Sequence, residues 1–408
     1  MARAGAGWLR RVGPWVGIGT SPAAMMMGGG VAQGLEGATL LAVLGAGTVA
    51  LTLLALAQGL LGQRTGLPLT ALVAGALGER ASRRTASIVM LAMMLGWFGL
   101  NAGVGGSALA RLIDAPEALG IVLFSAAILA VVWFGIGALS LSALVAGIAT
   151  VVLAVYGLDR AFAHTEVTLS GANTATDPTG VLAGVAIVVG YGAAFALRTP
   201  DFTHDLGRQR QVVWCALAGL CAPLAGFAVA GAALQAATGT WDLADVLLEL
   251  GSPGFAYAFL ALGFTGSVLT NLWSGALSLS HAAPRVPHRP ALVLVALAGG
   301  ALAVAGFSRL MLPYLTLMAL AAPGLVVVCW MHALWGRRAS SGWSPAGLGA
   351  WMLGVGAGVS LHLAGSWLAL PAAVVVPALV YGLAGRAGGE GEREEERFLD
   401  PTVEERAS

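Results

Sequence analysis

Residues 17–35 read GIGTSPAAMMMGGGVAQGL, an apolar stretch interrupted by glycines and by Pro22. A second stretch of the same character, IVVGYGAAFALRTP, covers residues 187–200. Transporters built from inverted repeats place their binding site near the bilayer midplane, where helices in equivalent positions of the two halves are broken. The pair therefore predicts unwound, cavity-lining backbone. Close helix packing through small residues is the alternative for residues 28–30.

The composition restricts the chain to the membrane. Of its 408 residues, 58% are hydrophobic and only 10% are charged, with a mean hydropathy of +0.84, whereas a soluble domain carries about 25% charged residues. This excludes an ordinary soluble enzyme, a disordered protein and a nucleic-acid binder. Cys215, Cys221 and Cys329 each lie in an apolar stretch, so they predict neither a disulfide framework nor a metal site.

The sequence predicts an all-α, polytopic membrane protein. A bilayer core needs about 20 apolar helical residues to cross, and twelve segments satisfy this. Two pairs of them are poorly separated, so eleven spans remain an alternative, and no cleavable signal peptide is visible. The segments lie near 13–35, 38–62, 86–110, 118–138, 141–158, 180–199, 211–236, 256–281, 291–307, 311–335, 346–365 and 367–385.

Charge then predicts the orientation. With the N-terminus inside and twelve spans, 18 of the 21 basic residues, all arginines, fall in inner segments, and the outer ones keep Arg111, Arg160 and Arg309. This positive-inside bias predicts a multi-pass protein of the cell inner (plasma) membrane with both termini cytoplasmic. We expect a cytoplasmic N-terminus (1–12), a transport core (13–335), two further spans (346–385) and an acidic, disordered tail (386–408).

The spans contain almost no charge, which limits the coupling mechanism. Proton-driven carriers often place a carboxylate within the membrane, and none is visible here. We therefore expect any coupling cation to be held by backbone carbonyls and hydroxyls, because hard cations favour oxygen ligands. The eighth span contains a dense polar stretch that is a candidate for this site. Hydrogen bonding between helices is the alternative role of these side chains. They are Thr265, Ser267, Thr270, Asn271 and Ser274.

An aromatic residue marks the middle of the third span. Trp97 lies between glycines in GWFG, followed by Asn101, and is too deep for the interfacial aromatic belt. Such a side chain can offer its face to a flat ligand. Tyr191 in the sixth span is a candidate for the opposing surface, and ordinary packing of the two rings is the alternative.

Several ionisable residues are candidates for gating or coupling. Asp201 and Asp205 lie in a charged cluster after the sixth span, which predicts either an inner gate or a helix end with compensating charges. His332 and His362 lie in apolar spans. Such a histidine relays protons or, as the alternative, is capped by a neighbouring carbonyl.

These stretches together resemble the nucleobase:cation symporter-1 family, also called purine–cytosine permeases, and most closely its bacterial cytosine permease branch. The resemblance runs in order from about residue 17 to about residue 338. It implies five-plus-five inverted repeats of the amino-acid–polyamine–organocation superfamily type, two further C-terminal helices, and alternating access. The motifs on which the resemblance rests are SPAAMMMGGGVAQGL, GQRTGLPL, GWFG, VVGYG, TPDFTHDLGR, TNLWSGALSLS and YLTLMALAAPG.

The resemblance also implies roles for individual residues. Trp97 matches the tryptophan on which the base ring stacks, His332 lies where the family tends to have an aspartate, and Met94 stands where the cytosine branch has glutamine. The remaining implied substrate residues are Phe98, Tyr191, Gly192, Asn271, Gly28 and Gly29, and the implied cation residues are Ala24, Met27, Ser267 and Thr270.

The departures from the family pattern point to a less polar substrate than cytosine. A site that hydrogen-bonds a polar ring leaves its own groups unpaired when the ring changes, and several such groups are missing at Met94, Gly192 and Ala194. We expect import of a nucleobase-like heterocycle, such as cytosine, another pyrimidine or purine, or a hydroxymethylpyrimidine-type thiamine precursor, with Na⁺ or H⁺ and no other cofactor. We expect a monomer or weak oligomer in the lipid bilayer, with no nucleic-acid partner. The alternatives are an amino-acid or amine symporter, a membrane enzyme or a sensor.

Overall fold

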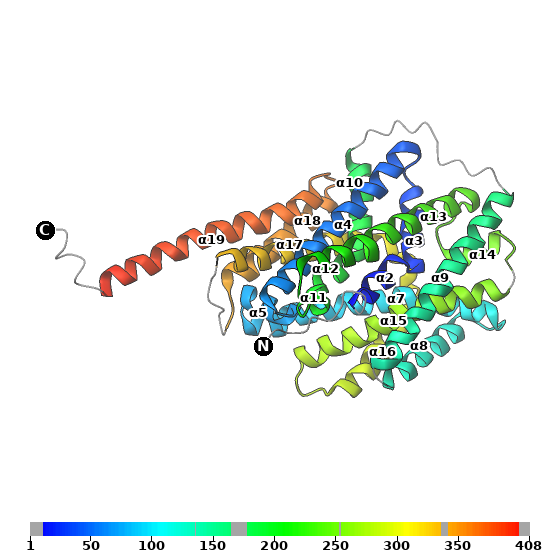
Figure 1. Cartoon of the computed structure of the whole chain (residues 1–408), viewed down its shortest axis with the longest axis horizontal. Helices are drawn as coiled ribbons and strands as arrows, with labels where there is room; N and C mark the ends of the chain where they lie inside the picture. The colour runs from blue at the N-terminus through cyan, green and yellow to red at the C-terminus, as the bar shows by residue number, and fades with distance from the viewer. Residues whose placement is uncertain (1–10, 135, 165–177, 253, 336–341, 400–408) are drawn as a thin grey trace.

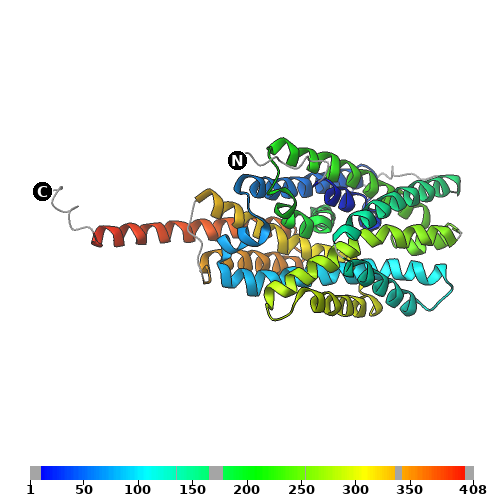
Figure 2. The ribbon, with the colours of Figure 1, turned by 60° about the horizontal axis from the view of Figure 1, so that its bottom comes forward.

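A computed structural model describes residues 11–134, 136–164, 178–252, 254–335 and 342–399, and every regular element in these ranges is a helix (Figure 1). The long helices lie side by side along one common direction (Figure 2). The helices are α2 (Gly13–Gly19), α3 (Pro22–Ala32), α4 (Gly37–Thr65), α5 (Leu69–Leu77), α6 (Glu79–Ala81), η1 (Ser82–Ala86), α7 (Ser87–Leu112), α8 (Glu117–Trp133), α9 (Ile136–His164), α10 (Pro178–Arg198), α11 (Pro200–Thr203), α12 (Gln209–Trp214), η2 (Cys215–Cys221), α13 (Ala222–Thr238), α14 (Leu243–Glu249), α15 (Gly254–Ala282), α16 (His288–Val304), η3 (Phe307–Leu310), α17 (Met311–Trp335), α18 (Pro345–Leu363) and α19 (Ala369–Leu399).

Each of the twelve predicted spans corresponds to a helix or to a broken helix in the structure. Among the described residues, 8 helices are long and apolar enough to cross a membrane, and three shorter apolar helices, α8, α16 and the first part of α19, follow the predicted fourth, ninth and twelfth spans. The remaining span, the first, is the broken pair α2 and α3. The all-helical, polytopic class predicted from the sequence is therefore confirmed.

The first span is broken, but not where the glycine run predicted. α2 ends at Gly19, and Ser21 adopts an extended conformation as the N-cap of α3, with Pro22 in its first turn. Serine is a favoured N-cap, and proline fits the first turn because that position needs no intrahelical N–H donor. Residues 28–30 lie inside α3, so the expectation of unwound backbone there is wrong.

The glycine run instead allows α3 to pack closely on α13. A Cβ atom at Gly28 would lie 2.0 Å from the Ala228 carbonyl oxygen, and one at Gly231 would lie 1.8 Å from the Met25 carbonyl oxygen. Both distances are far below van der Waals contact, so only glycine permits this approach. Small-residue packing, the alternative interpretation of this stretch, is the one that the structure shows.

The sixth span is interrupted near its end. α10 runs to Arg198, Thr199 separates it from the short α11, and Pro200 opens α11. Tyr191 and Gly192 lie within the continuous part of α10. The Thr199 hydroxyl donates to the Ala55 carbonyl at 3.0 Å, which fastens the interruption to α4.

The main helix pairs follow an inverted repeat of five spans plus five. α3 packs extensively on α13, and α10 packs extensively on α4. These are the pairs formed by spans 1 and 7 and by spans 6 and 2, so a shift of five spans converts one pair into the other. α7 and α15, the third spans of the two repeats, form the most extensive pair of all.

Polar contacts between loops join segments that the arginine distribution predicts on the same side. This agreement supports the predicted sidedness of the loops relative to one another. The contacts are Arg11 with Asp205, Gln63 with Leu206, Leu69 with Asp201 and Arg80 with Gly342 on the inner side, and Arg111 with Asp245 and Arg160 with Leu250 on the outer side.

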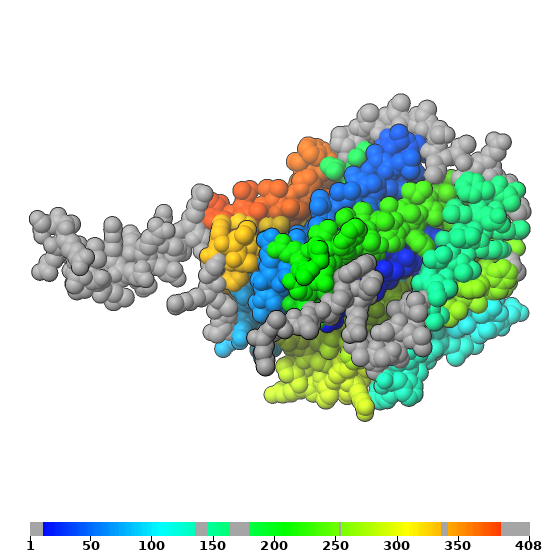
Figure 3. Space-filling model, viewed as in Figure 1, coloured from blue at the N-terminus to red at the C-terminus, as the bar shows by residue number. Residues whose placement is uncertain are grey.

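The outside of the bundle is apolar, as a lipid-facing surface requires. α4 alone exposes Leu41, Val49 and Leu53, and the space-filling view shows α4 in blue forming part of one face (Figure 3). The last helix, α19, extends away from the bundle (Figure 2). It remains helical to Leu399, into the segment predicted to be disordered, where glutamate and arginine, both good helix formers, predominate.

Candidate substrate and cation site

Three aromatic side chains from different spans meet in the core. The Trp97 ring of α7 lies 5.7 Å from the Tyr191 ring of α10 and 5.6 Å from the Tyr314 ring of α17, with interplanar angles of 87° and 81°. All three side chains are buried. The structure therefore brings Trp97 and Tyr191 together, and it adds Tyr314, which the sequence did not identify.

The Trp97–Tyr191 contact is edge-to-face, so the two rings leave no slot between them. A ring sandwiched between two aromatic planes needs about 7 Å from plane to plane, twice the contact distance of about 3.5 Å. In this conformation Tyr191 therefore does not supply a surface parallel to Trp97. A flat ligand that stacks on Trp97 requires the neighbouring rings to move.

The two tyrosines are fixed by hydrogen bonds to backbone carbonyls. The Tyr314 hydroxyl donates to the Met93 carbonyl oxygen at 2.5 Å, and the Tyr191 hydroxyl donates to the Ile18 carbonyl oxygen at 2.6 Å. Gly96 makes room for Tyr314, because a Cβ atom there would lie 2.5 Å from that ring. Trp97 is therefore linked through Tyr191 to the break in the first span.

The break leaves backbone carbonyls without their helical donors. In a continuous helix the carbonyls of residues 18–20 accept from the N–H groups four positions later. Pro22 has no N–H, the Ala23 N–H donates to the Ser21 hydroxyl, and the Ala24 N–H donates to the Ser21 carbonyl. The Ile18 carbonyl accepts instead from the Tyr191 hydroxyl and the Ser21 N–H. Carbonyls released from helical bonding are the groups that bind cations or polar ligand edges at broken helices.

The register between α7 and α15 places the polar stretch of the eighth span. Gly275 faces Met94, and Gly105 faces Phe264, with Cβ positions 3.4 and 3.2 Å from those side chains. Both helices advance by eleven residues between the two contacts, in opposite directions. This antiparallel register puts Asn271 level with Phe98, one residue from Trp97.

The hydroxyls of the predicted cation site occupy the same level. Thr270 lies level with Gly99, and Ser267 lies one turn further along α15. The two hydroxyls donate to the Gly266 carbonyl at 2.9 Å and the Phe264 carbonyl at 3.0 Å of their own helix, which leaves oxygen lone pairs for a cation.

The predicted carbonyl ligands, Ala24 and Met27, lie on the other side of the α3–α15 contact from the predicted hydroxyl ligands. α3 meets α15 at Pro22, 2.8 Å from a Cβ position on Gly263. Because spans 1 and 8 run in opposite directions, Ser267 and Thr270 lie on the α2 side of this contact, and Ala24 and Met27 lie on the other. The carbonyls bordering the break are on the same side as the hydroxyls.

Two buried polar groups near Trp97 have no hydrogen-bond partner among the described residues. They are Oδ1 of Asn101 and Oγ of Ser274. An unsatisfied buried polar group costs about 1–3 kcal/mol, so these atoms are expected to face water or a ligand. Asn101 lies one helical turn after Trp97 and on the same face of α7, and this i, i+4 spacing is the sequence signal that could have identified it.

One of the few charges in the spans reaches the core, although the arginine distribution assigns it to the inner loops. Arg198 ends α10, and its side chain is only 14% exposed. It extends along α7 rather than into solvent, with one terminal nitrogen 3.6 Å from the Met94 sulfur. The long side chain explains the error, because the position of its Cα says little about where its guanidinium lies.

A family model described as "Permease for cytosine/purines, uracil, thiamine, allantoin" matches residues 6–344, most of the chain. The chain belongs to this permease family. No protein among the curated sequences compared with it matches significantly. The resemblance noted from the sequence motifs is therefore confirmed, and the chain is a multi-pass membrane permease.

Solved structures of low sequence identity share the fold of this permease. Mhp1, a nucleobase-cation-symport-1 family transporter, matches in a closed conformation with bromovinylhydantoin bound, with TM-score 0.78, 18% identity and coverage of 96% of this chain and 94% of that chain. Its inward-facing conformation matches with TM-score 0.81, 17% identity and the same coverage. A Na⁺-coupled sialic acid symporter matches with TM-score 0.67, 12% identity and coverage of 94% and 91%.

Other residues predicted to form the permease site point away from Trp97. Phe98 packs toward α16, where its ring fills the space beside Gly299. A Cβ position on Gly192 faces Leu51 of α4. His332 contacts the Tyr381 hydroxyl at 3.1 Å and lies about 27 Å along α17 from Tyr314 at 1.5 Å per residue.

Ion pairs lie at both ends of the permease. At the inner end Asp205 pairs with Arg11, next to α2. Asp201 accepts from the Leu69 N–H at 2.9 Å, so its carboxylate also anchors α5. Asp201 and Asp205 therefore contact two further segments of the chain, and they connect the ends of spans 1 and 6 that the arginine distribution predicts on the inner side.

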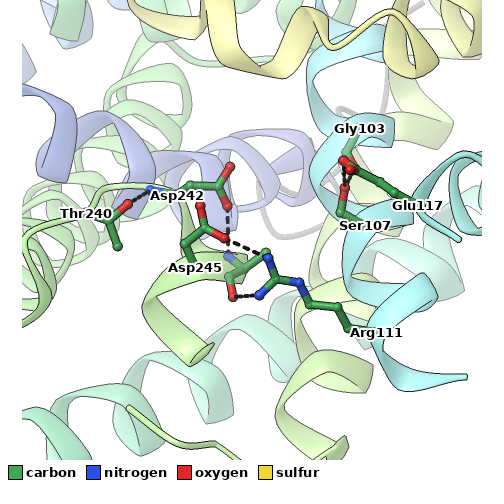
Figure 4. A network of polar contacts seen from close by, with 8 residues as sticks. Gly103, Ser107, Arg111, Glu117, Thr240, Asp242 and Asp245 are labelled. Carbon is green, nitrogen blue, oxygen red and sulfur yellow. Dashed lines mark hydrogen bonds and ion pairs between the residues drawn. The ribbon is translucent and has the colours of Figure 1, made fainter. Parts of the chain in front are cut away.

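At the outer end Arg111 fastens the short helix α14 to α7 (Figure 4). Its guanidinium donates to Asp245 and to the Ala244 carbonyl, both at 2.7 Å. Asp242 caps α14 by accepting from the Ala244 N–H at 2.9 Å. Burial raises the pKa of the Asp242 carboxyl above its ordinary value, and the hydrogen bond from Ala244 opposes this rise. The network holds α14 over the outer end of the core.

Proposed function

We propose that this permease imports a flat, nucleobase-like heterocycle by cation symport with alternating access. The observation that carries the proposal is the position of Trp97, buried between two tyrosines and linked through Tyr191 to the broken first span. An aromatic face beside released backbone carbonyls suits a planar ring with polar edges. Family membership independently supports a permease for this class of compound.

The proposed substrate position follows from the groups around Trp97. The ring stacks on Trp97 after Tyr191 or Tyr314 moves, and its edge bonds to the Asn101 and Asn271 amides. Apart from the guanidinium of Arg198, few other side-chain donors lie near Trp97, because Met94 carries none. This supports a ring that forms fewer hydrogen bonds to neutral side chains than cytosine does, such as another pyrimidine, a purine or a thiamine precursor.

The proposed cation lies between α15 and the break. Ser267 and Thr270 supply hydroxyl oxygens, and the carbonyls of residues 18–20 are better placed than those of Ala24 and Met27, whose helix is continuous. A cation here neutralises the partial negative charge at the C-terminal end of α2. Oxygen ligands alone favour Na⁺ over a proton as the coupling ion.

The remaining expectations are part of the same proposal. We propose that the chain is a permease and not an enzyme, that it lies in the cell inner (plasma) membrane with cytoplasmic termini, and that it works as a monomer or weak oligomer. An amine substrate is disfavoured, because the ionised group nearest to Trp97 is the cationic Arg198 rather than a carboxylate.

Ligand-dependent thermal stabilisation of the purified protein tests this function. The panel contains pyrimidines, purines, hydantoins and thiamine precursors, each with 100 mM Na⁺ or with choline replacing it. We expect at least one heterocycle to raise the melting temperature, and more so with Na⁺, because a ligand that binds only the folded state stabilises it. The absence of stabilisation by every heterocycle, with a positive response to amines or amino acids, overturns the proposal.

A further inference from the structure

Arg198 is a core charge without a strong partner. Among the described residues its only ion pair is with Asp201, at 4.0 Å between Nε and the carboxylate. Its other contacts are the Met94 sulfur, a weak acceptor, and the face of Phe202, 5.8 Å from the guanidinium carbon. A guanidinium has five N–H donors in a rigid fork, and these contacts use few of them.

The carboxylates nearby are engaged elsewhere. Asp201 accepts from the Leu69 N–H at 2.9 Å, much closer than Arg198, and Asp205 pairs with Arg11. The second oxygen of Asp201 faces Arg198, but at 4.0 Å from Nε, and Asp205 cannot approach Arg198 without giving up its bond to Arg11. The charge of Arg198 is therefore available to a group that comes from outside the protein.

The guanidinium lies next to the proposed substrate position. Met94, which it contacts, precedes Trp97 by one turn of α7, a rise of about 4.5 Å. Arg198 follows Tyr191 by two turns on the same face of α10. Because α7 and α10 run in opposite directions, the arginine reaches back toward the Trp97–Tyr191 contact from the cytoplasmic side.

We propose that Arg198 recognises the substrate and that the transported heterocycle carries an anionic edge, such as a ring carboxylate. This inference rests on the proposed function and narrows its substrate class. Arginine binds carboxylates through two parallel hydrogen bonds, which are short and strong in a site of low dielectric constant. An anionic ligand thus provides the acceptors that Asp201, Met94 and Phe202 do not.

A matched pair of ligands tests this inference. Orotate and uracil share one pyrimidine ring and differ in the carboxylate, so their dissociation constants are measured on purified wild-type protein, Arg198→Gln and Arg210→Gln, a control at an exposed arginine. We expect wild type to prefer orotate. Arg198→Gln weakens orotate about 10- to 100-fold and changes uracil by less than about 3-fold, the range for losing a charged hydrogen bond. Arg210→Gln changes neither.

The outcomes separate this inference from the proposed function. A wild-type protein that binds uracil or other neutral heterocycles and not orotate overturns the anionic class but keeps the heterocycle permease. Equal weakening of both ligands by Arg198→Gln also overturns the inference, because it assigns Arg198 a structural role. If Arg198→Gln does not fold, Arg198→Lys keeps the charge without the fork, and an unchanged preference for orotate then contradicts bidentate recognition. Failure of every heterocycle to bind overturns the proposed function itself.

Discussion

The proposed substrate position depends on the indole side chain of Trp97. We expect Trp97→Ala to reduce uptake of the transported heterocycle to background, because it removes the stacking face and loosens both tyrosines. The measurement is initial uptake of labelled substrate, normalised to protein in the membrane. Trp214→Ala is the control, since that side chain is 54% exposed. Uptake above half of the wild-type rate in Trp97→Ala contradicts the assignment.

The Tyr191 hydroxyl tests the link between the aromatic cluster and the broken span. Tyr191→Phe keeps the ring and removes the donor to the Ile18 carbonyl, which then retains only the longer bond from the Ser21 N–H at 3.4 Å. We expect the half-saturating Na⁺ concentration for uptake to change at least 3-fold, because the same carbonyls are proposed to border the cation. Tyr156→Phe, on α9, serves as the control. If the half-saturating Na⁺ concentration does not change, the Tyr191–Ile18 hydrogen bond does not contribute to cation coupling, and the prediction is wrong.

For single residues, the sequence predicted that Trp97 and Tyr191 meet, but it did not predict the edge-to-face geometry of their contact. Trp97 was found because a tryptophan in mid-span has no interfacial role, and its contact with Tyr191 followed. Arg198 was placed outside the membrane because hydropathy assigns a whole residue to one depth, whereas a long side chain spans several ångströms. Tyr314 gave no signal, because its role arises only from α17 packing against Gly96.

Among the elements, the close packing of α3 on α13 explains the glycines. We expect Gly231→Ala to lower the melting temperature of the purified protein by about 5 °C or more, because its new Cβ would overlap the Met25 carbonyl. Gly226→Ala, on the same helix with nothing within 4 Å of its Cβ position, is the matched control. It should be neutral or slightly stabilising, since alanine favours helices over glycine. Equal melting temperatures for the two variants argue against this interface.

The site of the break shows what a single sequence can and cannot reveal about an element. Three consecutive glycines outweighed a serine–proline pair as a signal for unwinding, although serine at an N-cap and proline after it are a typical helix start. Glycine serves both unwound backbone and close packing, and only the partner helix decides between them. That partner, α13, lies about 200 residues away in the chain.

For the whole molecule, the number and order of spans followed from hydropathy and arginine placement alone, because both act through the bilayer rather than through particular contacts. The inverted repeat became visible only from the packing of helix pairs in the structure. Its two halves are not packed alike: α9 packs extensively on α15, whereas the equivalent pair, α17 and α7, meets at few positions, Tyr314 with Gly96 and Trp97 among them. This difference marks α17 as an element able to shift relative to α7.

Alternating access requires that the ion pairs at the two ends do not both persist. Arg11 pairs with Asp205 at the inner end and Arg111 with Asp245 at the outer end. Each is partly exposed and is expected to contribute up to about 1 kcal/mol, which shifts a two-state population about 5-fold. Breaking one pair should therefore open that end alone.

A single reporter cysteine measures this shift. Asn271→Cys is introduced after Cys215, Cys221 and Cys329 are replaced by serine, and an impermeant maleimide is applied to right-side-out or inside-out vesicles. We expect Asp205→Asn to speed labelling from the cytoplasmic side and Asp245→Asn to speed it from the outer side, each about 2- to 5-fold, because each removes one attraction that holds its own end closed. Glu249→Gln, an exposed outer residue, should change neither. Faster labelling from both sides in one variant indicates general loosening and contradicts two independent gates.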